Sequence, residues 1–306
     1  MTTSESTVVP SSSLISKEQF VADLGSAAAS GRSWAGGKIG FSEQHWLTYP
    51  IFLAGLPERR KIRAFETMLR YHFERQSGVY PSDPRFARTF VDQYAEDLRQ
   101  LDCVGLFRAP GEAAIIRHHR LSCRFVAFTD MEPDRSSPAD ESRCYLPHFR
   151  GRRLLIVAPF ADLLRQRAEQ GTFEKVWART GKPWFHPSSV QAVEFPYAFE
   201  KATQARFPTV LDLKDEIAAR IDAVDFDVAL VAAGGLGIPL AAHIKRSGRI
   251  ALSLGGHLQI VFGVLGKRWK EIESWKRAYF NEHWIDLPQR YRPTDWEQLT
   301  DGGAYW

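Results

Sequence analysis

Cysteine, net charge and long apolar runs are all scarce in this sequence of 306 residues, and each scarcity excludes a class of protein. The three cysteines, Cys103, Cys123 and Cys144, have no CxxC spacing, so they predict neither a disulfide framework nor a zinc site. The 40 basic and 36 acidic residues leave a formal charge of only +4, which argues against a dedicated nucleic-acid-binding protein. So small a surplus is still compatible with a local basic pocket for a phosphate.

Membrane-spanning and secretory segments are also missing. No apolar stretch approaches the roughly 20 residues of a membrane helix, and the longest candidate, residues 228–242, is interrupted by glycines and a proline. Residues 1–16 are rich in Ser and Thr and lack the basic start of a secretory signal, so we expect a disordered tail. These patterns predict a cytoplasmic protein with no transmembrane segment, whose contact with a membrane would be peripheral.

The residues that are present have the composition of a globular protein, 44% hydrophobic and 25% charged. Residues 17–101 are largely helical in pattern, and Ser16 followed by Gln19 predicts a capping box for the first helix. From about residue 102 to 270, short apolar runs alternate with helical stretches. This alternation predicts an α/β fold, a Rossmann-like and mostly parallel sheet with flanking helices. The segment 271–306, which is rich in aromatic residues, should wrap over the α/β part of the chain, so we expect residues 17–306 to form one domain.

The individual elements follow from hydrophobic periodicity and from the glycines and prolines between the runs. Residues 36–40 are expected to form a glycine-dense turn before a new helix at 41–44, and residues 130–140 a polar loop. The predicted helices are 17–30, 61–77, 85–101, 161–170, 211–221 and 239–245. The apolar runs and predicted strands are 103–107, 123–128, 154–158, 190–195, 226–231 and 250–254.

The first candidate binding segment is residues 227–240, where an apolar strand runs into Gly234, Gly235 and Gly237 and then into a helix. Small residues let a ligand approach the backbone, and the first N–H groups of a helix attract an anion. The pattern is not a full GxGxxG with an acidic partner. A tight strand-to-helix turn without a ligand therefore stays open.

The second candidate segment is residues 253–269, where another strand ends in paired glycines. Ligands of doubly wound sheets bind beyond the carboxyl ends of the strands, so two glycine-ended strands favour a shared crevice. The cations at the end of the segment suit phosphate, although a solvated basic turn and a structural histidine are the alternatives. The candidate ligand-binding residues here are Gly255, Gly256, His257, Gln259, Lys267 and Arg268.

The third candidate segment is residues 38–43, which brings Lys38, Gly40, Ser42 and Glu43 together. Glu43 suits a general base or an oxygen ligand of a divalent cation. The alternative is that Ser42 and Glu43 only begin a helix, where a carboxylate favours the positive end of the dipole. Aromatic residues at 279–284 and 302–306 suit either stacking on a sugar or base or, as we favour, a hydrophobic latch.

Several segments taken together resemble bacterial proteins with a GT-D fold-like domain, often associated with polysaccharide biosynthesis. They are residues 154–160, ending in Ala-Pro-Phe, Asp225-Phe226-Asp227, residues 253–269, Tyr279-Phe280-Asn281-Glu282-His283-Trp284 and Gly302-Gly303-Ala304-Tyr305-Trp306. The resemblance covers about residues 38–306. It implies a glycosyltransferase that uses a nucleotide-sugar donor, with a uridine diphosphate sugar as the expected type, and a glycan or lipid-linked acceptor.

The same resemblance bears on the candidate residues. GT-D enzymes carry an Asp-x-Glu metal motif after an Arg-x-Gly-like turn, and residues 38–43 correspond to it. Glu43 matches the Glu, whereas Phe41 stands where the Asp would be. A divalent metal thus stays an open question, and we expect ligand binding to depend only weakly on it. His257 matches a histidine that follows a glycine in those enzymes.

Three functions compete at this point. In glycosyl transfer, Glu43 and His257 are the candidate catalytic residues, and the glycine segments with Lys267 and Arg268 stabilise the departing diphosphate. In an S-adenosylmethionine-dependent transferase, residues 234–237 would hold the amino-acid end of the cofactor, but no acidic residue closes a strand just after that turn. The third candidate is a non-catalytic protein that binds nucleotide sugars.

Overall fold

The chain folds around a seven-stranded, entirely parallel sheet with the strand order β3-β2-β1-β7-β6-β4-β5. The computed structural model describes residues 13–53, 57–133, 141–181 and 186–306. The strands are β1 (Trp34–Lys38), β2 (Cys103–Leu106), β3 (Arg124–Ala127), β4 (Arg153–Val157), β5 (Ser189–Val193), β6 (Val228–Val231) and β7 (Ile250–Ser253). The predicted Rossmann-like α/β class is therefore confirmed, with β1 and β7 at the centre of the sheet.

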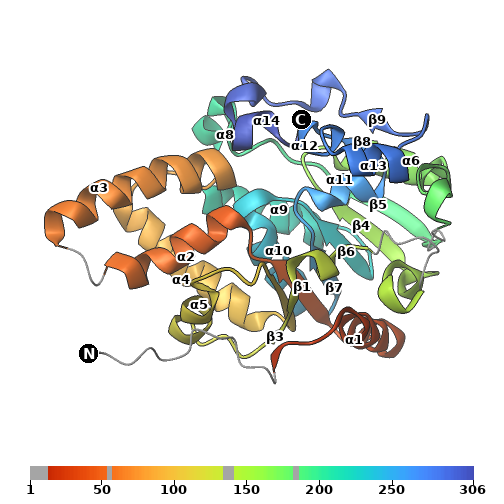
Figure 1. Ribbon diagram of the computed structural model, residues 1–306, viewed down its shortest axis with the longest axis horizontal. Coiled ribbons are helices and arrows are strands. Elements are labelled where there is room, and N and C mark those ends of the chain that lie inside the picture. Colours follow the sequence, from red (N-terminus) through yellow and green to blue (C-terminus); the bar gives the residue numbers. More distant parts are fainter. Residues whose placement is uncertain (1–12, 54–56, 134–140, 182–185) are drawn as a thin grey trace.

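Helices cover both faces of the sheet, which explains why its strands are apolar on both sides (Figure 1). In β4, Leu154 and Ile156 pack into one core cluster, whereas Leu155 and Val157 pack into the other. The longer helices are α1 (Lys17–Ser30), α2 (Phe41–Leu53), α3 (Glu58–Met68), α4 (Pro84–Gln100), α6 (Ala161–Glu169), α9 (Val210–Asp222) and α10 (Gly237–Arg246). The shorter ones are α5 (Glu112–His118), α7 (Thr172–Val176), α8 (Lys201–Arg206), α11 (His257–Val261), α12 (Lys267–Lys270), α13 (Glu273–Ala278) and α14 (Thr300–Gly303).

The helical N-terminal region agrees with the sequence pattern. Helix α1 begins with the predicted capping box, in which Ser16 and Gln19 bond each other's backbone N–H. Of the predicted tail, residues 1–12 lie outside the described residues, and Leu14 pairs with Phe125 beside β3. The helix predicted at 61–77 is α3, which continues directly as a π-helix, η2 (Leu69–Gln76).

The glycine-dense turn predicted at residues 36–40 is wrong for its first half, because Gly36 and Gly37 lie inside the central strand β1. A Cβ on Gly37 would collide with Ile238 of α10, and a Cβ on Gly36 would lie 2.5 Å from the ring of Trp34. Close packing over the middle of the sheet, rather than a turn, excludes side chains here. Of the three glycines, only Gly40 lies in the connection between β1 and α2.

The C-terminal segment lies over one end of the sheet, across the top of Figure 1. A small parallel pair, β8 (Val264–Leu265) and β9 (Ile285–Asp286), begins this layer. The last residues are tied back, since Lys267 N–H donates to the carbonyl of Trp306 at 3.2 Å and Arg268 N–H to that of Ala304 at 3.0 Å. Trp284 and Trp306 are buried, which fits the predicted latch.

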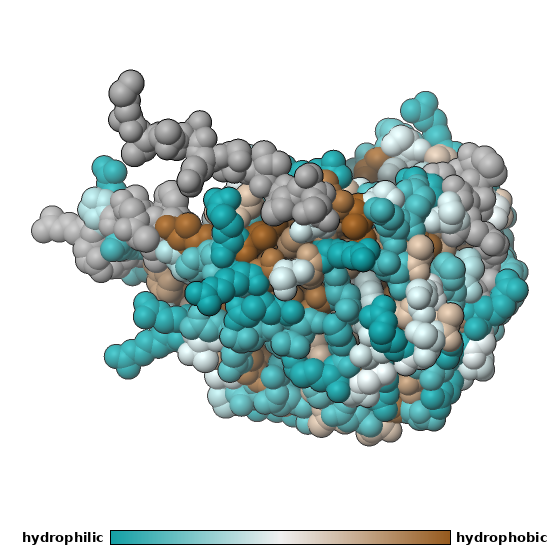
Figure 2. Space-filling model, turned by 90° about the horizontal axis from the view of Figure 1, so that it is seen from below, coloured by the Kyte–Doolittle hydropathy of each residue, from teal (hydrophilic) through white to brown (hydrophobic). Residues whose placement is uncertain are grey.

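The outer surface is ordinary for a folded domain of this kind. The face shown in Figure 2 is mostly hydrophilic, with one hydrophobic band towards its upper edge.

The three cysteines are free thiols, and burial raises the pKa of Cys103 and Cys123. Among the described residues, no helix combines the length and apolar character needed to cross a membrane.

Candidate functional site

A cavity of about 330 Å³ opens at the carboxyl ends of the strands. Its walls come from the residues that directly follow β1, β4, β6 and β7, together with the end of the chain. After β1 the chain enters α2, whose Trp46 belongs to one core cluster, whereas after the adjacent β7 it enters α11, whose Leu258 belongs to the other. The two connections therefore leave on opposite faces of the sheet. Such a switch point is where doubly wound sheets bind their ligands.

Glu43 lies in the wall of this cavity, in the first turn of α2. Its side chain is half-buried and lies against Gly40, the connection from β1. Burial raises the pKa of Glu43 above its ordinary value of 4.5, and hydrogen bonds from its own amide and from Ser77 offset part of this effect. Ser42 and Gly40 line the cavity beside it, so the structure brings the third predicted segment together.

Lys38 and His257 meet across the cavity floor on a shared carboxylate, Glu132. Lys38 Nζ lies 3.1 Å from Glu132 Oε1, and His257 Nδ1 lies 2.8 Å from the same oxygen. The Lys38 ammonium also lies 4.4 Å from the centre of the Phe128 ring. Glu132 is 2% exposed and lies behind the two lining side chains, so it orients both of them towards the cavity.

Sequence reasoning missed Glu132, because residues 130–140 were assigned to a polar loop. Phe128 to Met131 form a 3-10 turn directly after β3, and Glu132 ends it in a buried position, while residues 134–140 lie outside the described residues. The available signal was a carboxylate just beyond the apolar run 123–128. The rule that ligands gather at strand ends, applied to that run, would have singled it out.

The glycines after β6 are required mainly by the protein itself. A Cβ on Gly234, whose φ is +51°, would lie 2.8 Å from the carbonyl oxygen of Ser77, and one on Gly235 would lie 2.5 Å from Val79. A Cβ on Gly237 would collide with Ser253 of β7. Gly234 lines the cavity, whereas Gly235 and Gly237 do not. The predicted approach of a phosphate to these glycines stays a prediction.

The glycines after β7 face the cavity. Gly255 has a φ of +56° with open space where a Cβ would be, and a Cβ on Gly256 would collide with the ring of Tyr305. Gln259 also reaches the cavity wall, but its amide is 1% exposed and donates to the carbonyl of Tyr305 at 3.2 Å. Gln259 therefore ties down the end of the chain beside the cavity.

Lys267 and Arg268 are adjacent in sequence but differ in their position relative to the cavity. Arg268 lines the cavity, with its guanidinium 4.7 Å from the ring centre of Tyr305 and Nη1 3.1 Å from the Tyr305 hydroxyl. Both residues are exposed, but Lys267 does not line the cavity. Of the two predicted phosphate ligands, only Arg268 is placed to meet a ligand there.

Aromatic side chains form the remaining walls of the cavity. Phe107 and Phe128 are stacked with their ring centres 3.8 Å apart, and Trp269, Tyr305 and Trp306 also line the cavity. Aromatic faces of this kind bind a nucleobase or the apolar face of a sugar. The C-terminal aromatics thus serve both as a latch and as a cavity wall.

The residues at the expected metal motif do not fit a divalent cation held by protein carboxylates. Phe41 is 64% exposed and offers no oxygen, which leaves Glu43 alone. Across the described ranges of the chain, no three His, Cys, Asp or Glu side chains gather around one point. One carboxylate is a poor anchor for magnesium.

Comparison with solved structures finds two that match, and both are of a domain called domain of unknown function 1792. A selenomethionine-substituted structure of that domain is 14% identical over 80% of this chain and 78% of its own, with a TM-score of 0.39. A second structure, described as having a distinct glycosyltransferase fold, is 13% identical over 91% and 92%, with a TM-score of 0.41. No protein-family model matches the sequence, and no curated protein does.

Proposed function

We propose that this chain transfers a sugar from a nucleotide-sugar donor, expected to be of the uridine diphosphate type, to a hydroxyl of an acceptor. The observation that carries the proposal is that one cavity holds a carboxylate with a raised pKa, Glu43, together with the cations Lys38 and Arg268 and the imidazole of His257. A carboxylate that can take a proton and cations that can hold a diphosphate are the two requirements of the reaction.

The reaction assigns a role to each part of the cavity. The acceptor hydroxyl oxygen forms a bond to the anomeric carbon, and its proton moves to the Glu43 carboxylate. The bond from the anomeric carbon to the diphosphate oxygen breaks, and the electron pair leaves with the diphosphate. Arg268, with Lys38 and His257 held by Glu132, stabilises that negative charge.

Aromatic walls complete the arrangement. The Phe107–Phe128 stack and the Trp269–Tyr305 side offer faces for the base and the sugar. Because Glu43 must be ionised to act as a base, the rate should rise with pH through a pKa above its ordinary value of 4.5.

Thermal denaturation with a panel of ligands tests the proposal. UDP at 100 times its dissociation constant should stabilise the fold by about 2.7 kcal/mol, and S-adenosylmethionine should leave it unchanged. A shift with S-adenosylmethionine alone would overturn the proposal in favour of the other transferase class.

Turnover separates the enzyme from a binding protein. UDP release from UDP-sugars should be measured with glycan and lipid-linked acceptors, for the wild type and for Glu43→Gln. The variant should bind UDP normally and release none from its sugars. If the wild type binds UDP but transfers no sugar to any acceptor, the non-catalytic alternative holds.

A further inference from the structure

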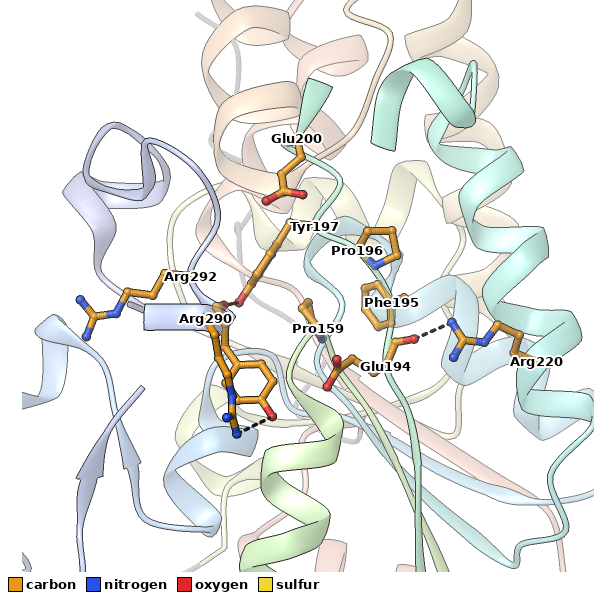
Figure 3. Close-up of a pocket in the computed structure, with 10 residues that line it drawn as sticks. Pro159, Glu194, Phe195, Pro196, Tyr197, Glu200, Arg220, Arg290 and Arg292 are labelled. Carbon is orange, nitrogen blue, oxygen red and sulfur yellow. Dashed lines mark hydrogen bonds between the residues drawn. The ribbon is translucent and has the colours of Figure 1, made fainter. Parts of the chain in front are cut away.

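A second and larger hollow, of about 640 Å³, adjoins the candidate site and carries arginines that no part of the proposed reaction uses. We define it as the arginine cleft, and Figure 3 shows its residues. It shares Pro159, Phe195 and Tyr197 with the cavity, so these residues lie between the two hollows. The other residues lining it are Glu194, Pro196, Glu200, Arg220, Arg290, Tyr291 and Arg292.

Tyr197 is the partition between the cleft and the cavity. Its hydroxyl donates to the carbonyl of Tyr291 on the cleft side at 2.8 Å and accepts from Trp306 Nε1 on the cavity side at 3.0 Å. Both bonds hold the ring in place, and burial raises its pKa, so the hydroxyl stays protonated. A molecule in the cleft would therefore lie directly beside a donor sugar in the cavity.

Among the residues that the structure describes, the arginines of the cleft form no close ion pair, although the carboxylate of Glu194 interacts electrostatically with Arg220 and Arg290. Within the described part of the chain, no carboxylate oxygen lies within 4.0 Å of the guanidinium groups of Arg220, Arg290 or Arg292. Neighbouring Arg165, by contrast, is bridged to Asp162 at 3.1 Å and to Glu169 at 2.9 Å. With three arginines and two glutamates in its lining, the cleft keeps one excess positive charge around a hollow large enough for a saccharide.

Figure 3 shows Arg220 and Arg290 on opposite sides of Glu194, with Arg292 further out. Arg220 Nη1 donates to the backbone carbonyl of Glu194 at 2.5 Å, and Arg290 lies over the ring of Tyr291 at 4.8 Å. These contacts fix the direction of both side chains while using few of their N–H donors. A fixed guanidinium with remaining donors suits bidentate binding of a carboxylate or phosphate.

The two acidic residues of the cleft, Glu194 and Glu200, indicate what the ligand carries besides an anionic group. Glu194 is half-buried, and its carboxylate accepts the N–H of Asp162 at 3.2 Å; burial raises its pKa. Glu194 and Glu200 offer oxygen atoms to hydroxyl groups, and Tyr197 and Tyr291 offer ring faces. An isolated anion would be repelled by these carboxylates, and an apolar chain would gain little from them.

We propose that the arginine cleft binds a saccharide that carries an anionic group, a carboxylate or a phosphate. Its role as the acceptor site rests on the proposed function, whereas the binding itself does not. The arginines hold the anionic group, the carboxylates accept hydrogen bonds from hydroxyls, and Tyr197 sets the ligand beside the cavity.

Titration calorimetry with simple probes tests the proposal. Glucuronate and glucose 6-phosphate separate the two sources of charge, while glucose and inorganic phosphate each lack one half of the ligand. At least one of the charged sugars should bind roughly tenfold more tightly than either glucose or phosphate. Equal affinity for glucose, or for phosphate, would overturn the proposal.

Variants and competition locate the binding. The double variant Arg220→Gln/Arg290→Gln should bind the charged sugar about tenfold more weakly and bind UDP with unchanged affinity. Arg165→Gln is the matched control. Displacement of UDP by the charged sugar, or an unchanged affinity in the double variant, would place the sugar elsewhere and contradict the proposal. If the charged sugar binds as expected but UDP does not bind, the cleft stands and the proposed function fails.

Discussion

Two neighbouring strands, β6 and β7, both end in glycines, yet their glycines serve different purposes. After β6, Gly234 and Gly235 lie against Ser77 and Val79, the segment that follows the π-helix. After β7, the glycines lie against Tyr305 and open space in the cavity wall. The same sequence feature can therefore reflect close packing within the protein or an open path to a ligand. The atoms that a Cβ at each glycine would meet distinguish the two cases.

The largest expected effect of this difference is on stability, in the variant Gly235→Val. The added side chain collides with Val79 and the Ser77 carbonyl, so overpacking should cost about 3 kcal/mol of folding free energy. Chemical denaturation measures this loss. The protein that remains folded should bind UDP within twofold of the wild type. A variant as stable as the wild type that no longer binds UDP would show that the β6 glycines admit the phosphate after all.

The next effect concerns the cation beside the β7 segment. Arg268→Ala should lower the affinity for UDP by roughly 1.5–3 kcal/mol, because a charge-assisted hydrogen bond in the cavity is lost. Lys267→Ala is the matched control, since it removes the same charge from the neighbouring residue outside the cavity. Calorimetric titration of both variants decides the point, and equal losses would mean that only the general field of the protein attracts UDP.

How much of this was predictable from the sequence depends on the kind of interaction. Local periodicity and capping predicted α1, α4 and the strand–helix alternation, because these depend on neighbouring residues. Gly36 and Gly37 were misassigned to a turn, since their partners, Trp34 and α10, are known only after folding.

The candidate site divides in the same way. Glu43, Lys38 and His257 follow recognisable glycines, and the fold brings them to one cavity. Glu132 and the arginine cleft were not found, because their partners come from segments distant in sequence. For Lys267 and Arg268, the sequence does not indicate which of the two side chains lines the cavity.

A smaller effect should separate the two glycines of the β7 segment. Gly256→Ala pushes the Tyr305 ring away and moves Arg268 with it, so UDP affinity should fall by about 1 kcal/mol. Gly255→Ala meets no neighbouring atom, and its left-handed φ should instead cost about 1 kcal/mol of stability with unchanged affinity. Titration and thermal denaturation of both variants test this. The reverse assignment of the two effects would place the ligand against Gly255.

The smallest effect is a dependence of stability on pH at Glu43. Its pKa is raised in the folded state, so its contribution to stability is complete below its ordinary pKa of 4.5 and is lost as pH rises through the folded value. Glu43→Gln removes the buried charge and should be more stable than the wild type at pH 8. That advantage should disappear towards pH 4. Thermal denaturation of both proteins across this pH range tests the assignment. A difference in stability between the variant and the wild type that stays constant with pH would contradict it.

The most direct measurement is a crystal structure of the chain with UDP, grown in EDTA. The account predicts a diphosphate within hydrogen-bonding distance of Arg268, lying along Gly255 and Gly256, with the base against the aromatic walls. It would be contradicted by a diphosphate bound to the N–H groups of Gly235 and Gly237. It would equally be contradicted by a complex that forms only with a divalent cation on Glu43.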